Sequence, residues 1–386
     1  MIGNAARVLA LALVLLASAC ALLPVGGRPN SAPAGKPSPV GRGLVEHRAA
    51  FHVHCYLSHD SRGRLSEIAQ AARSLGIDTV ILNDHYRAGN IRRAARGIHH
   101  DVLFVPGVEL RAGDKSSILS FGLEVDFSRK LSPAERLREA ARQGAASARG
   151  HVERLANLSL EPFQAFEVYN LHAELVAQSA WSLLWRFLFL PPDAFFEAAV
   201  ETPEVNLASW DRELVLGRRL AALAGHDAHA NVRLFGPLGG TIGTYPEILR
   251  LFSNHILATE RSVEGIVEAV RAGRTFVVFD YLADGTGFAL GYGPRDAPFE
   301  SLATIGDSAV FDRAHVLRTV IPPVEAESIR ARVVLDGRCE AVVEGTRDVC
   351  VPLSAGGAAR VEVYLGNRLW IISSPIYITR TRADRS

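Results

Sequence analysis

Short apolar runs alternate with amphipathic helical patterns over residues 47–283, and this alternation restricts the fold more than any other feature of the sequence. Helices are predicted at 65–75 and 263–270, each followed by a glycine that suits a C-terminal cap. Buried strands are predicted at 77–82, 102–110, 165–170, 220–225 and 275–279. Apolar strands separated by helices predict an α/β domain with a parallel sheet covered by helices, either open or closed into a barrel.

The helical pattern stops after Asp284, and short strand-like segments with turn residues continue to the C-terminus. Residues 284–386 are therefore predicted to form a second domain, a small β-sandwich of about seven strands. A two-residue hairpin predicted at Glu344-Gly345 would place Cys339 opposite Cys350, within reach of a disulfide. Two free thiols are the alternative, because a hydrogen-bonded pair of positions is not the easiest site for that bond.

The N-terminus is typical of a targeting segment. An apolar run of nine residues follows Arg7 and is too short to span a bilayer comfortably, and "ASAC" then ends at Cys20. We expect residues 1–20 to be a lipoprotein-type signal peptide, with a lipid on Cys20 that anchors the protein outside the cytoplasm in a bacterial cell envelope. Ordinary secretion is the alternative. Residues 21–46, rich in Pro, Gly and Ser, are predicted to be a linker.

Charge and hydropathy limit the partners. The formal net charge is +1 and no basic run is present, so no nucleic-acid partner is predicted. The segment "WSLLWRFLFL" (residues 181–190) is too short to cross a membrane and is predicted to be a buried helix or a lid rather than a membrane contact. The oligomeric state is left open.

Clusters of His, Asp and Glu follow the predicted strands. His52 and His54 lie at the end of one, "NDH" (83–85) ends the next, Glu109 ends a third, and "GHDAH" (225–229) follows a later one. Two histidines spaced i, i+2 on a strand face the same side. Because the carboxyl ends of parallel strands share one rim, the clusters should meet there. Imidazole and carboxylate ligands suit Zn, Mn or Fe, so a metal site is predicted.

These motifs resemble those of the PHP (polymerase and histidinol phosphatase) superfamily. "HVHCYLSHD" is similar to H-x-H-T-x-x-S-x-D, and "LNDH", "GVE" and "GHDAH" are similar to T-D-H, the third motif and G-S-D-A-H, in the same order. The resemblance covers residues 48–280 and implies a distorted seven-stranded (β/α) barrel with two or three divalent ions; the segments that follow are similar to a secreted subgroup with a C-terminal sandwich. "RGHVE" is similar to the family's His-Pro segment, with Val152 in place of Pro. The implied metal ligands are His52, His54, Asp60, His85, Glu109 (as a bridge), His151, Asp227 and His229.

Several residues depart from the family pattern or have no assigned role. Cys55 replaces a threonine; its thiol could bind metal, but its side chain points off the face of the two histidines, which favours packing. His226 replaces a serine, and either metal ligation or a contact to substrate or ligands fits. His59 is interpreted as a neighbour of the site. Asn170 matches a polar strand-end residue of the family, and His172 is the nearby alternative.

The predicted activity is hydrolysis of a small-molecule phosphoester by metal-activated water. Asp60, Asp84, His226 and His229 are candidates for proton transfer. Arg87, Arg111 and Arg233 lie just past the motifs and could hold a phosphate or simply face solvent. Two alternatives remain: a metal-dependent hydrolase of esters, amides or carbamates, and a non-catalytic surface protein that binds a partner or glycan.

Overall fold

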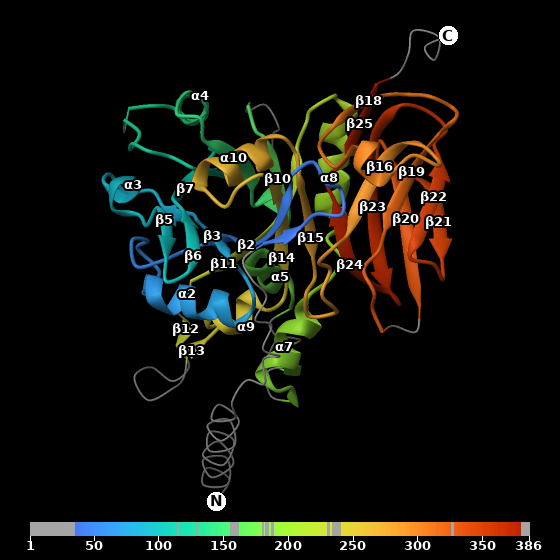
Figure 1. The fold of residues 1–386 in the computed structure, drawn as a ribbon. Helices are drawn as coiled ribbons and strands as arrows, with labels where there is room; N and C mark the ends of the chain where they lie inside the picture. The colour runs from blue at the N-terminus through green and yellow to red at the C-terminus, as the bar shows by residue number, and fades with distance from the viewer. Residues whose placement is uncertain are drawn as a thin grey trace, which may run out of the picture.

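The fold is a mixed α/β arrangement in which one large sheet runs through the whole molecule (Figure 1). The computed structural model of the 386-residue chain describes residues 35–113, 116–128, 130–154, 162–179, 181, 185–186, 189–229, 232–233, 241–325 and 328–379. The predicted signal peptide and Cys20 lie outside these residues, so both stay predictions.

The N-terminal strands pair in a closed circuit. Its members are β2 (Val45–Val53), β3 (Thr79–Leu82) continued by β4 (Asp84–His85), β6 (Val102–Val105) continued by β7 (Gly107–Arg111), β8 (Ser117–Phe121), β9 (Ala146–Gly150), β10 (Ala165–Asn170) and β11 (Ala221–Ala228). Each pairs with the next, and β11 pairs back onto β2. With each continued strand counted once, the circuit has seven strands.

The circuit is mostly parallel, with one exception. β8 runs antiparallel to both β7 and β9, so the sequence prediction of parallel strands alone missed it. The strands predicted at 77–82, 102–110, 165–170 and 220–225 are all present, although the second is interrupted at Pro106. Two further strands extend this sheet: β14 (Ser253–Ala258) pairs antiparallel with the first half of β2, and β15 (Thr275–Val278) pairs antiparallel with β14.

Helices cover this circuit, and their apolar faces supply the core. α2 (Leu65–Ser74) buries Ile68, Ala69, Ala71 and Ala72, and α10 (Val263–Arg271) packs Ile266 and Val270 with strand residues such as Phe51 and Phe121. The N-terminus of α4 (Pro133–Arg142) is fixed by a capping box between Ser132 and Glu135. The remaining helices are α3 (Asn90–Arg93), α5 (Leu171–Ala177), α7 (Pro192–Ala199), α8 (Glu204–Val215) and α9 (Tyr245–Leu249), with short 3-10 turns at Val152–Arg154 and Phe299–Ser301.

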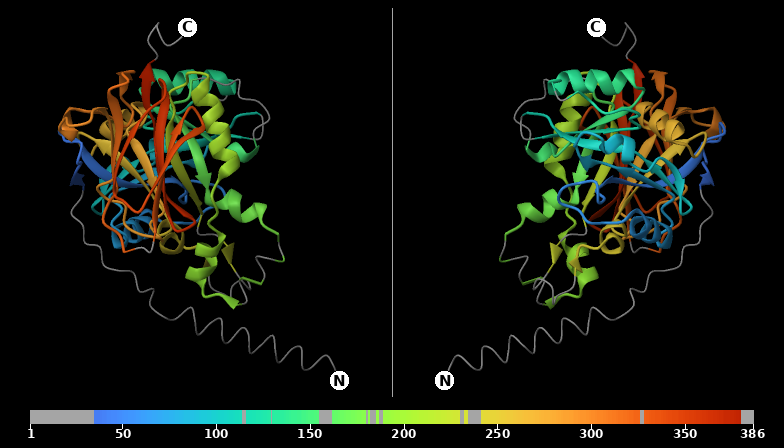
Figure 2. Two further views of the ribbon diagram at one scale, coloured as in Figure 1. Left: turned by 90° about the vertical axis from the view of Figure 1, so that its right-hand side faces the viewer. Right: turned by 90° about the vertical axis from the view of Figure 1, so that its left-hand side faces the viewer.

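The C-terminal part consists of two packed layers of strands, seen at the right of Figure 1 and in the orange and red strands of Figure 2. One layer is the small antiparallel sheet of β16 (Ala289–Pro294), β17 (Ala303–Thr304), β19 (His315–Val320) and β22 (Asp348–Pro352). The other continues the large sheet with β18 (Ser308–Val310), β20 (Ile329–Leu335), β21 (Arg338–Glu344), β23 (Gly357–Leu365), β24 (Arg368–Ser373) and β25 (Ile376–Thr379). A common apolar cluster containing Leu317, Val333 and Trp370 joins the layers.

The boundaries between the predicted parts are less sharp than expected. β1 (Lys36–Pro37) pairs with the start of β2, and Glu46 is buried, so the ordered sheet begins before the predicted boundary at residue 47. The two parts also share hydrogen bonds, because β15 pairs antiparallel with β24. The C-terminal strands therefore extend the sheet of the N-terminal part.

The hairpin predicted at Glu344-Gly345 and its disulfide are wrong. The turn lies at Asp336-Gly337, both with positive φ (48° and 76°), as the two-residue hairpin turn requires. β21 pairs with β20, whereas β22 pairs with β19 in the other sheet. Cys339 and Cys350 are accordingly on different sheets, and both are free thiols. The Asp-Gly pair was the stronger turn signal.

The apolar segment 181–190 differs from the predicted buried helix. Its described residues Trp181, Trp185 and Phe189 have 66%, 46% and 69% of their surface exposed. The Trp181 and Trp185 rings meet edge to face and the Trp185 and Phe189 rings stack. Within the described part of the chain, no helix has the length and apolar character that a membrane crossing requires.

Candidate metal centre

Strained backbone presents three of the predicted ligands. His52, His151 and Asp227 have positive φ values of 59°, 50° and 49°, a conformation that non-glycine residues adopt at some energetic cost. The register of β2 against both β3 and β11 shifts at this point. The sequence predicted that His52 and His54 share a face through regular pleating, and this is not how they come together. An irregularity in β2 brings their rings together, with centroids 5.1 Å apart.

Glu109 lies among four imidazoles. Its Oε2 is 3.1 Å from Nδ1 of His85 and 3.6 and 3.7 Å from Nε2 of His52 and His54. Its Oε1 is 3.4 Å from Nε2 of His151. Because the two oxygens face different histidines, the carboxylate is placed to bridge two ions.

The two carboxylate oxygens of Asp227 also face different histidines, which the sequence did not predict. Its Oδ1 is 3.2 Å from Nε2 of His54 and 3.6 Å from Nε2 of His52, and Oδ2 is 3.5 Å from Nε2 of His151. Asp227 is the second-to-last residue of β11 and, like Glu109, lies beside His52, His54 and His151. Two buried carboxylates thus share three imidazoles of the centre.

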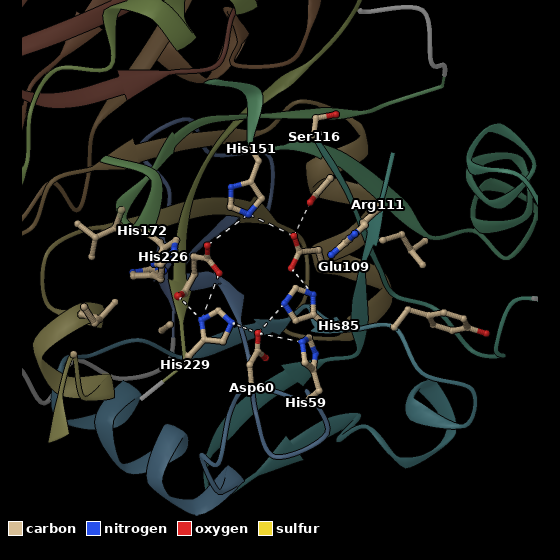
Figure 3. A pocket seen from close by; sticks show the side chains of 18 of the residues that line it. His59, Asp60, His85, Glu109, Arg111, Ser116, His151, His172, His226 and His229 are labelled. Carbon is tan, nitrogen blue, oxygen red and sulfur yellow. Dashed lines mark hydrogen bonds and ion pairs between the residues drawn. The ribbon is translucent and has the colours of Figure 1, made fainter. Parts of the chain in front are cut away.

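Asp60 forms the outer edge of the centre. Its Oδ2 is 3.0 Å from Nε2 of His85 and 3.4 Å from Nε2 of His229. Figure 3 shows His85, His151, His229, Asp60 and Glu109 pointing toward one another around one opening.

The structure brings all eight predicted ligands together in three overlapping groups. Within each group the ligand atoms lie within 4.8 Å of one another. The groups are His54, Asp60, His85 and His229; His52, His54 and Glu109; and His52, His151 and Asp227. His52 and His54 each belong to two groups, so the groups form one continuous cluster.

Polar partners behind the cluster orient its side chains, and the sequence analysis missed the most important of them. Glu167, fully buried on β10, accepts a hydrogen bond from Nδ1 of His52 (2.7 Å) and from the backbone N–H of His151 (2.8 Å). Gly225 allows this approach, because a Cβ there would lie 1.9 Å from Glu167 Oε1. The only available signal was an acidic residue within the otherwise apolar predicted strand 165–170.

Two serines hold further members in place. Ser58 donates to Asp60 Oδ1 (2.7 Å), accepts from the backbone N–H of His85 (3.2 Å) and lies 3.3 Å from Nδ1 of His54. Ser117, on the antiparallel strand β8, donates to Oε1 of Glu109 at 2.6 Å. The unpredicted strand β8 therefore supports the carboxylate of Glu109.

The electrostatic field of the cluster attracts positive charge. Burial favours the protonated form of Glu109, but the neighbouring imidazoles of His151, His52 and His54 outweigh it and hold the pKa well below the usual range. The pKa of Asp227 is lowered too, since the nearby imidazoles of His52 and His54 overcome burial. Burial lowers the pKa of His151, yet hydrogen bonds to Glu109 and Glu153 raise it to about 10. The buried carboxylates thus favour the protonated forms of His52 and His151, and the same field would favour a divalent cation.

The unpaired atoms of the centre fit a metal. Nε2 of His52, Nε2 of His54 and Oε2 of Glu109 are buried and make no hydrogen bond. Leaving such atoms unpaired is costly, and all three face the shared interior of the cluster. Nitrogen and oxygen donors of this kind suit Zn, Mn or Fe.

Asp84 lies behind the centre rather than in it. Its carboxylate accepts the backbone N–H of Cys55 (2.7 Å) and the Cys55 thiol (3.0 Å). Burial raises the pKa of Asp84 to about 6, although both hydrogen bonds from Cys55 act to lower it. Cys55 packs in the apolar core, as its predicted direction indicated, and neither residue belongs to a ligand group.

Both ring nitrogens of His226 lie beside backbone carbonyl oxygens. Nδ1 lies 3.1 Å from the carbonyl oxygen of Phe51 and Nε2 lies 2.9 Å from that of Phe252, and its ring stacks on Phe252. His226 belongs to none of the three ligand groups, although it lines the pocket over the cluster, and its predicted part in proton transfer stays a prediction. Burial lowers the pKa of His226 to about 4.

The other predicted residues line the pocket over the cluster or fall outside the description. His59, His172, Arg87 and Arg111 are exposed lining residues. Asn170 is buried and caps α5 by accepting the N–H of Ala173. Arg233 lies in the two-residue strand β12 (Val232–Arg233), and its side chain is outside the described part.

The chain is similar to solved structures but not to characterised sequences. No protein-family model matches the sequence, and no characterised protein matches it. Among solved structures, the chain is similar to a two-domain protein from Bacteroides vulgatus ATCC 8482 that contains a predicted PHP-like metal-dependent phosphoesterase. The two chains are 16% identical with a TM-score of 0.43, over 90% of this chain and 99% of the other.

Replacement of Glu167 tests the support of the centre. Glu167→Gln should weaken metal binding by about 10- to 100-fold, because a partner that fixes a ligand histidine typically contributes that much. Titration of bound metal against a competing chelator measures this. Glu46→Gln is a matched control, since Glu46 is a buried carboxylate that pairs with a histidine, His255 (2.5 Å), outside the cluster. Equal metal affinity in the two variants would contradict the assigned role.

Proposed function

We propose that the protein is a metal-dependent phosphoesterase of the PHP type that uses two or three divalent ions, Zn, Mn or Fe. The observation that carries this proposal is the convergence of eight His, Asp and Glu side chains into three overlapping ligand groups with unpaired buried atoms at their centre. Clustered ionisable residues, three of them with strained backbone, are more typical of a functional site than of a structural core.

The fold around the centre supports the same family. The closed circuit of seven paired strands agrees with a distorted barrel, and all the ligands except Glu109, which is in the middle of β7, lie at or after the carboxyl ends of its strands. The four motifs occur in the order that the superfamily uses. The C-terminal strand layers agree with a sandwich appended to that barrel.

The residues of the chain would divide the work as follows. The eight ligand side chains would hold the ions, which supply an activated water and stabilise charge on the phosphoryl oxygen. Glu109 and Asp227 place two carboxylates across the centre and so balance the positive charge there. Arg87 and Arg111 line the pocket and present guanidinium groups to a phosphate.

Proton transfer falls to residues at the open edge. Asp60 and His229 have 32% and 15% of their side chains exposed, and Asp60 Oδ2 is 3.4 Å from His229 Nε2. Burial acts to raise the pKa of Asp60, but the hydrogen bond from Ser58 and the charges of His229 and His85 outweigh burial. The net pKa is lowered, so the carboxylate is ionised at neutral pH. Because a lowered pKa makes Asp60 a weak base, we assign the acceptance of a proton at this open edge to His229, with Asp60 orienting its ring.

Loss of two ligands tests the proposal. In a His52→Ala/His54→Ala double variant, we expect bound metal to fall by at least one ion per chain and hydrolysis of p-nitrophenyl phosphate to fall more than about 100-fold, since ligand loss exceeds the usual effect of an outer partner. Elemental analysis and a colorimetric assay with added Mn²⁺ or Zn²⁺ provide the readouts. Treatment of the unmodified protein with a chelator should abolish the activity, and added metal should restore it.

Two controls make the outcome interpretable. His99→Ala/His100→Ala removes two exposed histidines remote from the cluster and should retain metal and activity. The double ligand variant and the chelated protein should share one unfolding midpoint, which would show that the fold persists. Unchanged metal content would refute the site. Metal-loaded protein that hydrolyses only p-nitrophenyl acetate would be an ester hydrolase, and inactivity on every substrate would favour a binding protein.

We further propose that the protein is a lipoprotein of the bacterial cell envelope, anchored through Cys20. The apolar run and "ASAC" support this, as does the Pro/Gly/Ser-rich stretch that follows.

The anchor has a direct test. In a bacterial host, the mature chain should begin at Cys20, carry a lipid detectable by mass spectrometry and partition into detergent. Cys20→Ser should remove the lipid and leave the chain in the aqueous phase, whereas Cys339→Ser, at an exposed thiol, should behave as the unmodified chain. A mature chain without lipid would indicate ordinary secretion.

A further inference from the structure

The pocket over the candidate metal centre is much larger than a phosphate requires. Its volume is about 1750 Å³, whereas sites for small organic molecules typically measure about 300–1,000 Å³. The ligand cluster forms only one part of its lining. The remaining walls are therefore available to the organic part of a substrate.

One of these walls is mostly apolar, with His172 of α5 as its polar member. Leu171 and Leu175 lie one turn apart on the same face of α5, and both line the pocket with Phe195 and Phe196 of α7 and Ile248 of α9. The rings of Phe195 and Phe196 have centroids 5.1 Å apart. A Cβ at Gly243 would lie 3.8 Å from Ile248 Cδ1 and 4.0 Å from Phe196 Cζ, so α7 and α9 meet at this wall.

The wall still has surface to offer a ligand. Leu175 and Phe195 are only partly buried and pack at the edge of the main core, although both face the pocket. Covering such side chains with an apolar group removes them from water, which is favourable.

Positive charge is confined to the other side of the pocket. Among the described lining residues, the guanidinium groups are those of Arg87 after β4, Arg111 at the end of β7 and Arg136 on α4. In Figure 3, Arg111 lies across the opening from His172, which belongs to α5. A phosphate would be drawn toward the metal ligands and the arginines, which leaves its ester group directed at α5, α7 and α9. Sugar or nucleoside hydroxyls would lose their hydrogen bonds to water against that wall, whereas an alkyl or aryl group would not.

We infer that this wall is a binding site for an apolar ester group, so that the substrates are phosphoesters of hydrophobic alcohols or phenols. The inference rests on the proposed phosphoesterase function for its anionic end. In the overall reaction, water oxygen forms a bond to phosphorus, the bond from phosphorus to the ester oxygen breaks, and the released alcohol takes up a proton that the water loses.

Alkylphosphonates test the wall without any turnover. Methyl-, butyl- and octylphosphonate share one anionic group and differ only in chain length. Calorimetric titration of the Mn²⁺-loaded protein should show affinity rising about threefold for each methylene that becomes buried. Octylphosphonate should bind at least about 100-fold more tightly than methylphosphonate by that increment.

Two variants locate the effect on the wall. Leu175→Gln, which keeps a good helix former on α5, should reduce octylphosphonate affinity about tenfold, by loss of roughly two buried methylenes, and leave methylphosphonate affinity and metal content unchanged. Phe195→Gln on α7 should also reduce octylphosphonate affinity, and it replaces the first variant if that variant does not fold. Leu216→Gln, at a leucine that is 70% exposed at the end of α8, is the matched control and should change neither affinity.

The outcomes separate the wall from the chemistry. Equal affinity along the series, with methylphosphonate bound, would overturn the apolar site and leave the phosphoesterase proposal standing. Chain-dependent affinity that persists undiminished in both wall variants would also overturn it. Chain-dependent affinity lost in those variants, without hydrolysis of any phosphate ester, would support the wall and reject the phosphoesterase. Absence of any phosphonate binding by the metal-loaded protein would reject both.

Discussion

Two buried carboxylates, Glu109 and Asp227, impose the central constraint on this structure. Each has 7% of its surface exposed, and both remain ionised because imidazoles surround them. Buried charge is unfavourable unless it is paired, so the surrounding fold must supply positive partners and hold them in place. His52 and His151, whose pKa values are raised, supply such partners, and the unpaired inner nitrogens of His52 and His54 leave the interior of the cluster suited to divalent cations.

The fold meets that constraint through irregularities in an otherwise regular sheet. A shift of register in β2 turns His52 inward, and strained backbone does the same for His151 and Asp227. Glu167 accepts hydrogen bonds from both His52 and His151, and its carboxylate fits there because residue 225 is a glycine. Strain of this kind persists only when many neighbouring contacts determine the conformation. The sheet that continues through β15 and β24 into the C-terminal layers adds such contacts around the N-terminal part.

The sequence predicted the parts of this arrangement that depend on local pattern. Strand and helix positions followed from hydrophobic periodicity, and His52, Glu109 and Asp227 were identified because polar residues after parallel strands share a rim. It failed where long-range pairing decides the outcome. β8 pairs antiparallel with strands on both sides, Glu167 looks like one acidic residue in an apolar strand, and the Asp336-Gly337 turn placed Cys339 and Cys350 in different sheets. His226 was a candidate for chemistry, and the sequence did not indicate that its ring nitrogens would lie beside two backbone carbonyl oxygens.

The most direct measurement of the account is crystallography of the metal-loaded protein with anomalous scattering recorded at the absorption edge of the bound element. We expect two or three anomalous peaks inside the cluster, each bounded by one of the three ligand groups, with Glu109 contacting more than one ion. Peaks elsewhere on the molecule, or a cluster that holds no metal at saturating concentration while the eight side chains keep their positions, would contradict the account.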